Sequence, residues 1–285
     1  MAGFALASGY ALFVWWFSTG VIILLDNLSP RTFKWSMCGA TAVLALALAA
    51  IGATRDQTSV AGAYAAFTAA LLAWGWNEIS FYTGTVTGPR NRRCPEGCSG
   101  LKHFGHAIAV SLYHEIAVLA GAAAVFALAW RGTNHVAVWT YAVLWWMHQS
   151  ARLNVMLGVR NCNEHFLPPH LDFLRSFLRR APMNLLFPVS VTASTVVAVV
   201  LFQRAFATGA DAFAAVSFTF LGVLMALAIA EHWFLMVPLD FAALWRWSVR
   251  GRETVETLRN VHPAAAPHCA RHDVSARAAE LRPTA

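Results

Sequence analysis

The sequence predicts an all-α polytopic membrane protein that crosses the bilayer about seven times. Of its 285 residues, 58% are hydrophobic and only 12% are charged, against a charged fraction of about 25% in ordinary soluble domains. Long apolar runs alternate with short polar stretches along nearly the whole chain, which leaves no room for a separate soluble domain. We therefore expect one membrane domain, residues 1–250, followed by a disordered basic tail, residues 251–285.

Seven apolar segments each approach the ~20 residues that an α-helix needs to cross ~30 Å of hydrocarbon. The first segment lacks the basic start and the small-residue cleavage site of a secretory signal, so we expect it to remain as the first helix. The predicted helices cover residues 2–25, 34–53, 59–82, 104–130, 135–157, 184–207 and 213–237.

The basic residues test this count, because successive connections must lie on alternate sides of the membrane. One side receives only Arg55, Arg131 and Arg204 of the 21 Lys and Arg residues, which leaves 18 on the other side. Since cytoplasmic connections carry the excess of Lys and Arg, the N-terminus is predicted to be periplasmic and the C-terminus cytoplasmic, in a bacterial inner membrane. The net charge of +7 then reflects topology and lipid headgroups, and we expect no nucleic-acid partner.

Two connections on the predicted cytoplasmic side are long, residues 83–103 and 158–183, and loops of this length usually have a function or are disordered. Within the second connection, residues 172–180 contain pairs of apolar side chains separated by basic ones, and this pattern predicts a short amphipathic helix lying on the headgroups. Residues 241–247 are expected to behave in the same way. The two long connections are therefore predicted to cover, on the water side, any site at the cytoplasmic end of the helices.

Five cysteines are too few and too scattered for a disulfide framework. Only Cys94 and Cys98 lie close together, in a connection on the predicted reducing side. Their interval differs from the Cys-x-x-Cys of a paired zinc knuckle, and the sequence shows no obvious partner pair. Their role is left open.

Ionisable groups at membrane depth cost about 2.5–3.5 kcal/mol each, so they are the first place to look for a function. Our topology places all of them in the cytoplasmic half of the membrane. On the fourth predicted helix, His103, His106 and His114 fall within about 80° of one another and are expected to form a single inward-facing stripe. The primary site candidates are Glu78, His106, His114, Glu115, His148, Glu231 and His232.

These residues admit three interpretations. Mixed His and Glu side chains can hold a transition metal such as iron. The same imidazoles can ligate the metal of a tetrapyrrole such as bacteriochlorophyll, with Trp145 and Trp146 packing on the macrocycle. Alternatively, they form buried ion pairs, for example Glu231 with Arg152 or Glu78 with a histidine. Secondary candidates, including a loop pair that could cap the site, are Arg152, Asn154, Glu164, His165, Trp145 and Trp146.

Four stretches of sequence carry a family resemblance. They are Glu-Ile-Ser-Phe-Tyr-Thr-Gly-Thr-Val-Thr-Gly-Pro-Arg at 78–90, the segment from Gly-His to Tyr-His-Glu at 105–115, Leu-Asn-Val at 153–155 with Asn161, and Phe-Leu-Pro-Pro-His at 166–170 running on to Pro-Met-Asn-Leu-Leu-Phe-Pro at 182–188. Together they resemble the PuhE-type photosynthetic-complex assembly proteins of anoxygenic purple bacteria. The resemblance implies a role in building the reaction centre and core antenna or in supplying bacteriochlorophyll, in the intracytoplasmic membrane. It supplies no catalytic residues.

The leading hypothesis is therefore a non-enzymatic assembly factor whose cavity handles a pigment or a nascent pigment-binding helix, with His106, His114 and His148 as ligands. Its partners would be reaction-centre or antenna subunits, or enzymes of pigment synthesis. The alternative is an intramembrane His/Glu metalloenzyme that modifies a tetrapyrrole, quinone or carotenoid. Side chains that converge on one point favour a bound metal, whereas side chains that pair with Arg152 or with one another favour a scaffold.

Overall fold

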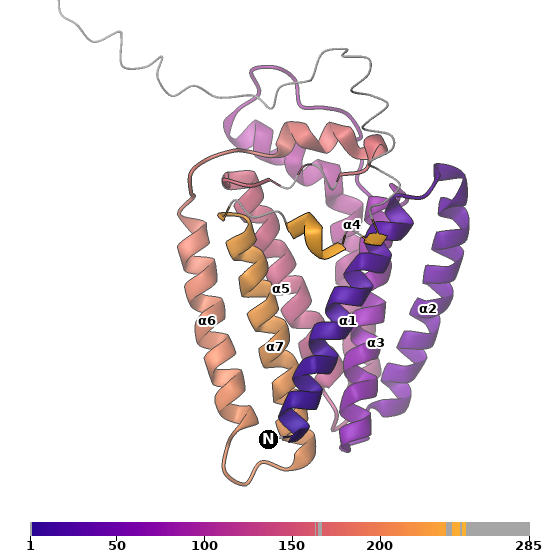
Figure 1. Ribbon diagram of the computed structural model, residues 1–285. Helices are drawn as coiled ribbons and strands as arrows, with labels where there is room; N and C mark the ends of the chain where they lie inside the picture. The colour runs from indigo at the N-terminus through magenta and orange to yellow at the C-terminus, as the bar shows by residue number, and fades with distance from the viewer. Residues whose placement is uncertain (1, 163, 165–166, 238–240, 246, 249–285) are drawn as a thin grey trace, which may run out of the picture.

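The computed structural model describes residues 2–162, 164, 167–237, 241–245 and 247–248, and these contain no β-strand. Every long helix matches a predicted segment to within four residues at each end. The predicted tail, residues 251–285, lies outside the described residues. The long helices form one bundle (Figure 1) and are α1 (Ala2–Asp26), α2 (Phe33–Thr54), α3 (Val60–Tyr82), α4 (Gly100–Ala129), α5 (Val136–Leu157), α6 (Leu186–Ala205) and α7 (Ala212–Phe234).

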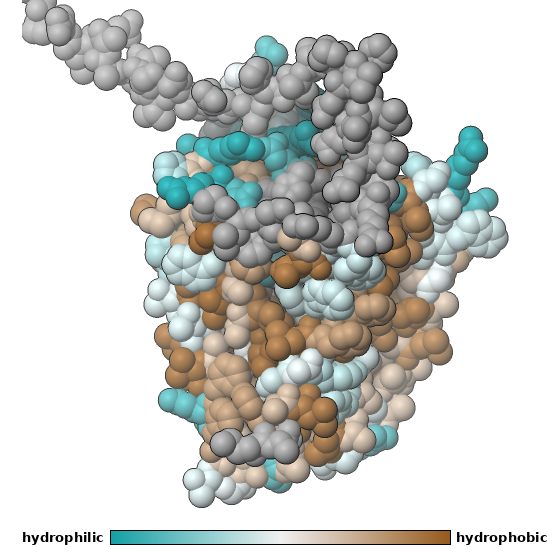
Figure 2. Space-filling view, viewed as in Figure 1, coloured by the Kyte–Doolittle hydropathy of each residue, from teal (hydrophilic) through white to brown (hydrophobic). Residues whose placement is uncertain are grey.

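Five of these helices, α1, α2, α4, α6 and α7, are long and apolar enough to cross a membrane. The helices α3 and α5 are equally long, with 23 and 22 residues, and they carry polar side chains such as Glu78 and Arg152. Apolar side chains cover the middle of the bundle surface, and hydrophilic ones lie above and below (Figure 2). The described part of the chain is therefore all-helical and compatible with a membrane protein, and a crossing by α3 and by α5 remains a prediction.

The helix α3 lies inside the bundle and packs against α1, α2, α4, α5 and α7. Its buried face is rich in alanine, including Ala63, Ala66 and Ala70, and such small side chains let neighbouring helices approach closely. Phe67 of this face stacks on Phe220 of α7, with ring centroids 4.4 Å apart. This contact fills the centre of the bundle.

One end of the bundle carries the connections 83–99 and 158–185, and we call it the loop end. At the opposite end, the side chain of Asn134 joins two short connections. Its Nδ2 lies 3.1–3.2 Å from the carbonyl oxygens of Thr54, Gln57 and Gly62, and its backbone N–H donates to Arg55 O at 2.7 Å. The connection between α2 and α3 is thus fastened to that between α4 and α5.

A 3₁₀ helix, η3 (Pro169–Phe177), crosses the loop end (Figure 1). Because a 3₁₀ helix has three residues per turn, Leu171, Leu174 and Phe177 form one stripe, and they are buried against the first turns of α4. The predicted amphipathic helix at 172–180 thus starts earlier in the chain, and its apolar side chains face the protein instead of the lipid headgroups.

The second predicted surface helix is a short 3₁₀ helix, η4 (Phe241–Trp245), and it also packs on the protein. Trp245 is buried, and its Nε1–H donates to Trp16 O at 2.9 Å. Both surface helices therefore close the loop end of the bundle.

A kink in α4 links this bundle to the loop end. Ser111 has non-helical backbone angles (φ −130°, ψ 16°), so the helical hydrogen-bond ladder is interrupted there. The N–H of His114 donates instead to Thr87 O, at 2.9 Å, in the connection 83–99. Next to it, Gly88 approaches α4 so closely that a Cβ would lie 2.5 Å from the carbonyl carbon of Val110. Only glycine fits this position.

We predict that Gly88→Ala destabilises the protein by about 1–3 kcal/mol, because the new methyl group overlaps the α4 backbone, which has no room to move. The matched control is Gly105→Ala on α4, where an added Cβ meets nothing within 4 Å. Thermal unfolding of the purified protein in detergent should show a lower midpoint for Gly88→Ala alone. Equal midpoints for Gly88→Ala and the unmodified protein would contradict the close contact.

Candidate functional site

A cavity of about 560 Å³ lies among α1, α3, α4, α5 and α7, near the loop end. This volume falls within the range of about 300–1,000 Å³ that is typical of sites for small molecules and cofactors. The residues Leu174 and Phe177 of η3 form part of its roof. The walls are mainly apolar, and the carboxylate, imidazole and guanidinium side chains that line them are Asp26, Glu78, His114, His148, Arg152 and Glu231.

Three of these side chains converge. Glu78 from the last turns of α3, His114 from α4 and His148 from α5 each offer one ligand atom, and these atoms lie within 4.8 Å of one another. His148 Nδ1 is 3.5 Å from Glu78 Oε1, and Trp74 packs edge-to-face on the His148 ring at 5.4 Å. We call Glu78, His114 and His148 the cavity triad.

His114 is the most unusual member of the triad. Its side chain is only 2% exposed, yet neither ring nitrogen has a hydrogen-bond partner among the described residues. Buried polar groups in proteins are nearly always paired, so an unpaired imidazole beside a cavity is typical of a ligand site. The kink at Ser111 and the backbone bond to Thr87 fix the part of α4 from which this ring projects.

Glu115, the next residue along α4, belongs to a partly buried ion pair. Arg152 of α5 binds one Glu115 carboxylate oxygen and also donates to the Ser111 hydroxyl, while Gln149 donates to the other carboxylate oxygen. The pair predicted between Arg152 and Glu231 therefore does not form, because Arg152 lies next to the α4 kink. Glu115 and Arg152 join α4 to α5 and are satisfied without a ligand.

Two further carboxylates face the cavity. Glu231 of α7 accepts a hydrogen bond of 3.0 Å from Trp15 Nε1. Asp26 at the end of α1 is 7% exposed, and its Oδ1 has no hydrogen-bond partner in the described part of the chain. Sequence analysis missed Asp26 because the first predicted helix stopped one residue earlier. The signal was an acidic residue directly after a long apolar run.

His232 and Asn154 serve the packing of the helices. The His232 Nδ1–H donates to Ala228 O at 2.9 Å, which leaves Nε2 to accept from the Ser150 hydroxyl at 2.8 Å. Asn154 Nδ2 lies 2.9 Å from Ser150 O and 3.2 Å from Ser190 Oγ. Both ring nitrogens of His232 are occupied, so this predicted ligand joins α7 to α5 and does not reach the triad.

The aromatic residues predicted to stack on a pigment lie elsewhere. Trp145 and Trp146 are 37% and 59% exposed and do not line the cavity. Trp145 is rotated by about 60° from His148 on an α-helix, enough to turn it outward. The cavity is lined instead by the tryptophans of α1, α3 and η4, namely Trp15, Trp74 and Trp245.

The predicted loop cap is also absent from the cavity lining. Glu164 forms an ion pair with Arg180 within the connection 158–185. His165 lies outside the described residues. The roof is formed by η3 instead.

The predicted stripe of three histidines is divided by the kink. His114 faces the cavity, whereas His103 and His106 face the connection 83–99, where their Nδ1 atoms lie 3.3 and 3.5 Å from Cys94 Sγ. The eight residues from His106 to His114 correspond to about 12 Å along a helix axis, and the break at Ser111 changes the direction of the side chains. Burial raises the pKa of the Cys94 thiol.

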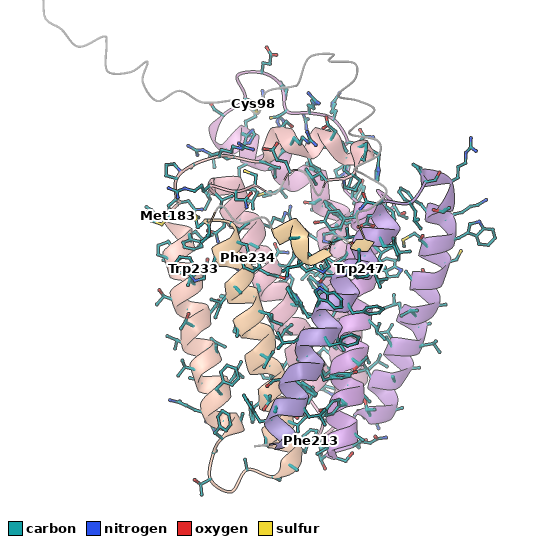
Figure 3. The ribbon with its side chains drawn as sticks, viewed as in Figure 1. Cys98, Met183, Phe213, Trp233, Phe234 and Trp247 are labelled. Atoms are coloured by element: carbon teal, nitrogen blue, oxygen red, sulfur yellow. The ribbon has the colours of Figure 1, made fainter. Side chains whose placement is uncertain are left out.

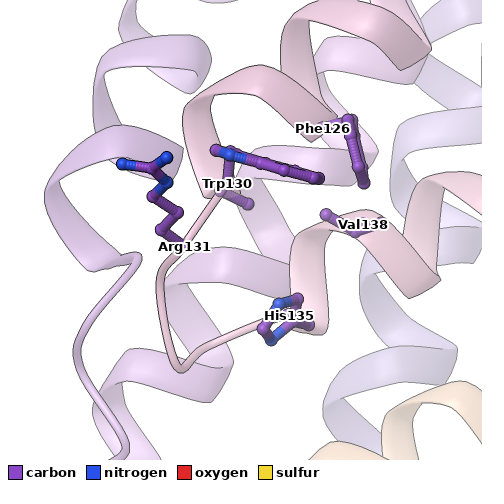
Figure 4. A pocket seen from close by; sticks show the side chains of 6 residues that line it. Phe126, Trp130, Arg131, His135 and Val138 are labelled. Carbon is purple, nitrogen blue, oxygen red and sulfur yellow. The ribbon is translucent and has the colours of Figure 1, made fainter.

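A second cavity, of about 280 Å³, lies between α4 and α5 at the opposite end (Figure 4). Its described lining includes no carboxylate, and it offers no group of converging ligand atoms. The residues that line it are Phe126, Ala129, Trp130, Arg131, His135 and Val138. The larger cavity is therefore the candidate site.

We predict that Arg152→Leu destabilises the protein by about 1–3 kcal/mol, because it removes the charged partner of the partly buried Glu115 carboxylate and leaves only Gln149 to donate to it. The double variant Arg152→Leu, Glu115→Leu removes both charges and should recover most of the loss. Thermal unfolding of the single and the double variant in detergent measures the loss of stability and its recovery. A double variant no more stable than Arg152→Leu would show that the pair does not act as a unit.

Comparison with known proteins shows the family. The family model described as "Protein of unknown function (DUF3623)" matches residues 1–256. A Rhodobacter capsulatus protein named "Uncharacterized 30.4 kDa protein in puhA 5'region" is 38% identical over 261 residues, which cover 90% of this chain and 95% of that protein. No solved structure matches the chain. The chain belongs to the DUF3623 family.

Proposed function

We propose that the protein is a PuhE-type assembly factor for the photosynthetic reaction centre and core antenna, and that its cavity holds bacteriochlorophyll or a related tetrapyrrole. The name of the R. capsulatus relative refers to the 5′ region of puhA. The sequence resemblance described above supports the same assignment. The expected location is the intracytoplasmic membrane, and the expected partners are reaction-centre or antenna subunits or enzymes of pigment synthesis.

The observation that carries this proposal is the unpaired, buried imidazole of His114. A metal at the centre of a tetrapyrrole accepts an axial imidazole nitrogen, and His114 has both nitrogens available next to the cavity. The apolar walls would pack against the macrocycle, and Trp15 and Trp74 add aromatic surface. His114 would thus hold the metal of the tetrapyrrole, and the apolar lining would exclude water from it.

The other two members of the cavity triad would orient and tune this site. Glu78 lies within ion-pair distance of His148, and a carboxylate that accepts a ring N–H fixes the orientation of an imidazole. His148 in turn lies beside His114, with ring centroids 5.6 Å apart. This arrangement binds and releases a ligand without a chemical step.

A second function is favoured by the same triad. One carboxylate and two imidazoles with ligand atoms within 4.8 Å match the donor set of the non-haem iron site known as the facial triad. With a metal ion at this point, the protein would be a membrane metalloenzyme that acts on a tetrapyrrole, quinone or carotenoid. Glu78 separates the two functions, because a metal ion needs the carboxylate directly and a pigment does not.

We predict that protein purified from a photosynthetic host carries bound pigment, and that His114→Leu lowers its pigment content by about tenfold or more because the axial bond is lost. Glu78→Gln should retain most of the pigment. The matched control is His135→Leu, which changes an exposed histidine at the opposite end. Visible absorption of the purified variants measures the pigment, and elemental analysis measures transition metals.

Equal pigment in His114→Leu and in the unmodified protein would refute the axial ligand. A pigment-free protein that carries iron, and loses it in Glu78→Gln, would establish the metalloenzyme instead.

We further propose that all seven helices cross the membrane, with the loop end in the cytoplasm. The helices α3 and α5 have the length of the others, and their polar side chains turn toward neighbouring helices and the cavity, away from lipid. The basic residues of the connections favour this orientation, as in other membrane proteins. The N-terminus is then periplasmic.

This topology predicts the activity of reporter fusions. Alkaline phosphatase, which is active only outside the cytoplasm, should be active when fused after Asp56 or Gly209 and inactive after Arg92 or Leu167. A fluorescent protein that matures only in the cytoplasm should show the reverse pattern. Phosphatase activity after Arg92 would contradict the proposed orientation.

A further inference from the structure

Two thiols and one imidazole converge at the loop end, away from the cavity triad: Cys94, Cys98 and His106 each offer a ligand atom within 4.8 Å of the other two, and His103 lies beside Cys94. Cys94 Sγ lies 3.3 Å from His103 Nδ1 and 3.5 Å from His106 Nδ1, and Cys98 Sγ lies 3.4 Å from the same His106 atom. Cys98 lies beyond the ends of the long helices (Figure 3). The four side chains come from two adjacent elements, the connection 83–99 and the first turns of α4.

The local sequence accounts for this arrangement. The Cys98 N–H donates to Pro95 O at 3.2 Å, and Gly97 has a positive φ of 74°, as a type II turn requires at its third residue. The turn reverses the chain and brings the two cysteines together. On α4, His103 and His106 are three residues apart and so project from one face of the helix.

The distances fit a common ligand better than they fit hydrogen bonds. His106 Nδ1 faces two sulfur atoms at similar distances, but a ring nitrogen carries either one proton or one lone pair and cannot satisfy both thiols equally. Tetrahedral zinc with Zn–S bonds of about 2.3 Å and Zn–N bonds of about 2.0–2.1 Å separates sulfur from nitrogen by about 3.5–3.6 Å. The observed separations, 3.3–3.5 Å, lie close to this value.

We propose that Cys94, Cys98, His103 and His106 bind one Zn²⁺ ion. On binding, each cysteine loses its thiol proton to the solvent and ligates as thiolate, and each imidazole ligates through Nδ1 in its neutral form. Two thiolates cancel the charge of the ion, so the complex is neutral and suits a loop with many arginines. The set Cys₂His₂ is a closed structural type with no position left for a substrate.

The sequence shows no partner pair for these cysteines, whereas in the structure His103 and His106 lie beside them. The spacing Cys-x₃-Cys lies within the range of structural zinc sites, but the histidines are closer together in sequence than the usual His-x₃₋₅-His. Two ligands on successive turns of one helix make the shorter interval workable.

The zinc site would fasten the roof of the cavity. The Cys94 N–H donates to Ser176 Oγ of η3 at 2.9 Å. The His103 ring packs on the ring of Phe177, a residue of the cavity roof, with the ring centroids 5.7 Å apart. Arg93 also forms an ion pair with Asp172 of η3. A metal between the connection 83–99 and α4 thus holds η3 in place from its outer side.

The first test is the zinc content of the full-length protein in detergent. We expect about one zinc per chain in the unmodified protein and at least about a fivefold loss in Cys94→Ser, Cys98→Ser. Cys38→Ser, at an exposed cysteine on α2, is the matched control and should keep its zinc. Glu78→Gln should also keep it, which separates this site from the cavity triad. An unmodified protein without zinc would overturn the proposal.

The second test uses the unmodified sequence, so that a folding defect cannot mimic the result. Maleimide labelling followed by mass spectrometry should modify Cys38 at once, and Cys94 and Cys98 only after a chelator is added. Cobalt(II) reconstitution should then give sulfur-to-metal charge-transfer absorption, which the triad cannot produce because it has no thiolate. Equal labelling with and without chelator, or a disulfide between Cys94 and Cys98, would refute the site.

Discussion

The structure depends on the contact between the connection 83–99 and the kink in α4. In a membrane, an interrupted helix must satisfy its freed backbone groups within the protein, because lipid offers no hydrogen bonds. Here Thr87 accepts the N–H of His114, and Gly88 allows the two backbones to approach. This contact fixes the direction of His114 toward the cavity on one side and of the two loop-end histidines toward Cys94 on the other.

The polar side chains of the bundle divide into those that are satisfied and those that are not. Glu115 and Arg152 neutralise each other, and His232 uses both ring nitrogens within the protein. These groups stabilise the packing of α4, α5 and α7. His114 remains unpaired, and Asp26 keeps one free oxygen within the described residues. Among the ionisable side chains of the described α-helices, those with a buried atom that lacks a hydrogen-bond partner line the larger cavity, so a function is expected there.

The helices could be predicted closely because each is a long apolar run bounded by polar residues. Glu78, His114 and His148 were also identified, since ionisable residues are rare at membrane depth. The separation of His114 from His103 and His106 could not be predicted. It results from the kink at Ser111, and a serine also occurs in regular helices, so the sequence near Ser111 gives no sign of a kink. The partners of Cys94 were missed for a related reason: the contact depends on how a loop folds back onto the following helix, which hydropathy and spacing do not encode.

The central packing gives the cavity a floor. Phe67 and Phe220 stack in the middle of the bundle with essentially no exposed surface, and Asn134 fastens two connections beyond them. This packed layer separates the cavity from the opposite end of the bundle. A molecule held in the cavity would therefore find no path along the centre of the described bundle to that end, and the cavity has the shape of a chamber rather than of a channel.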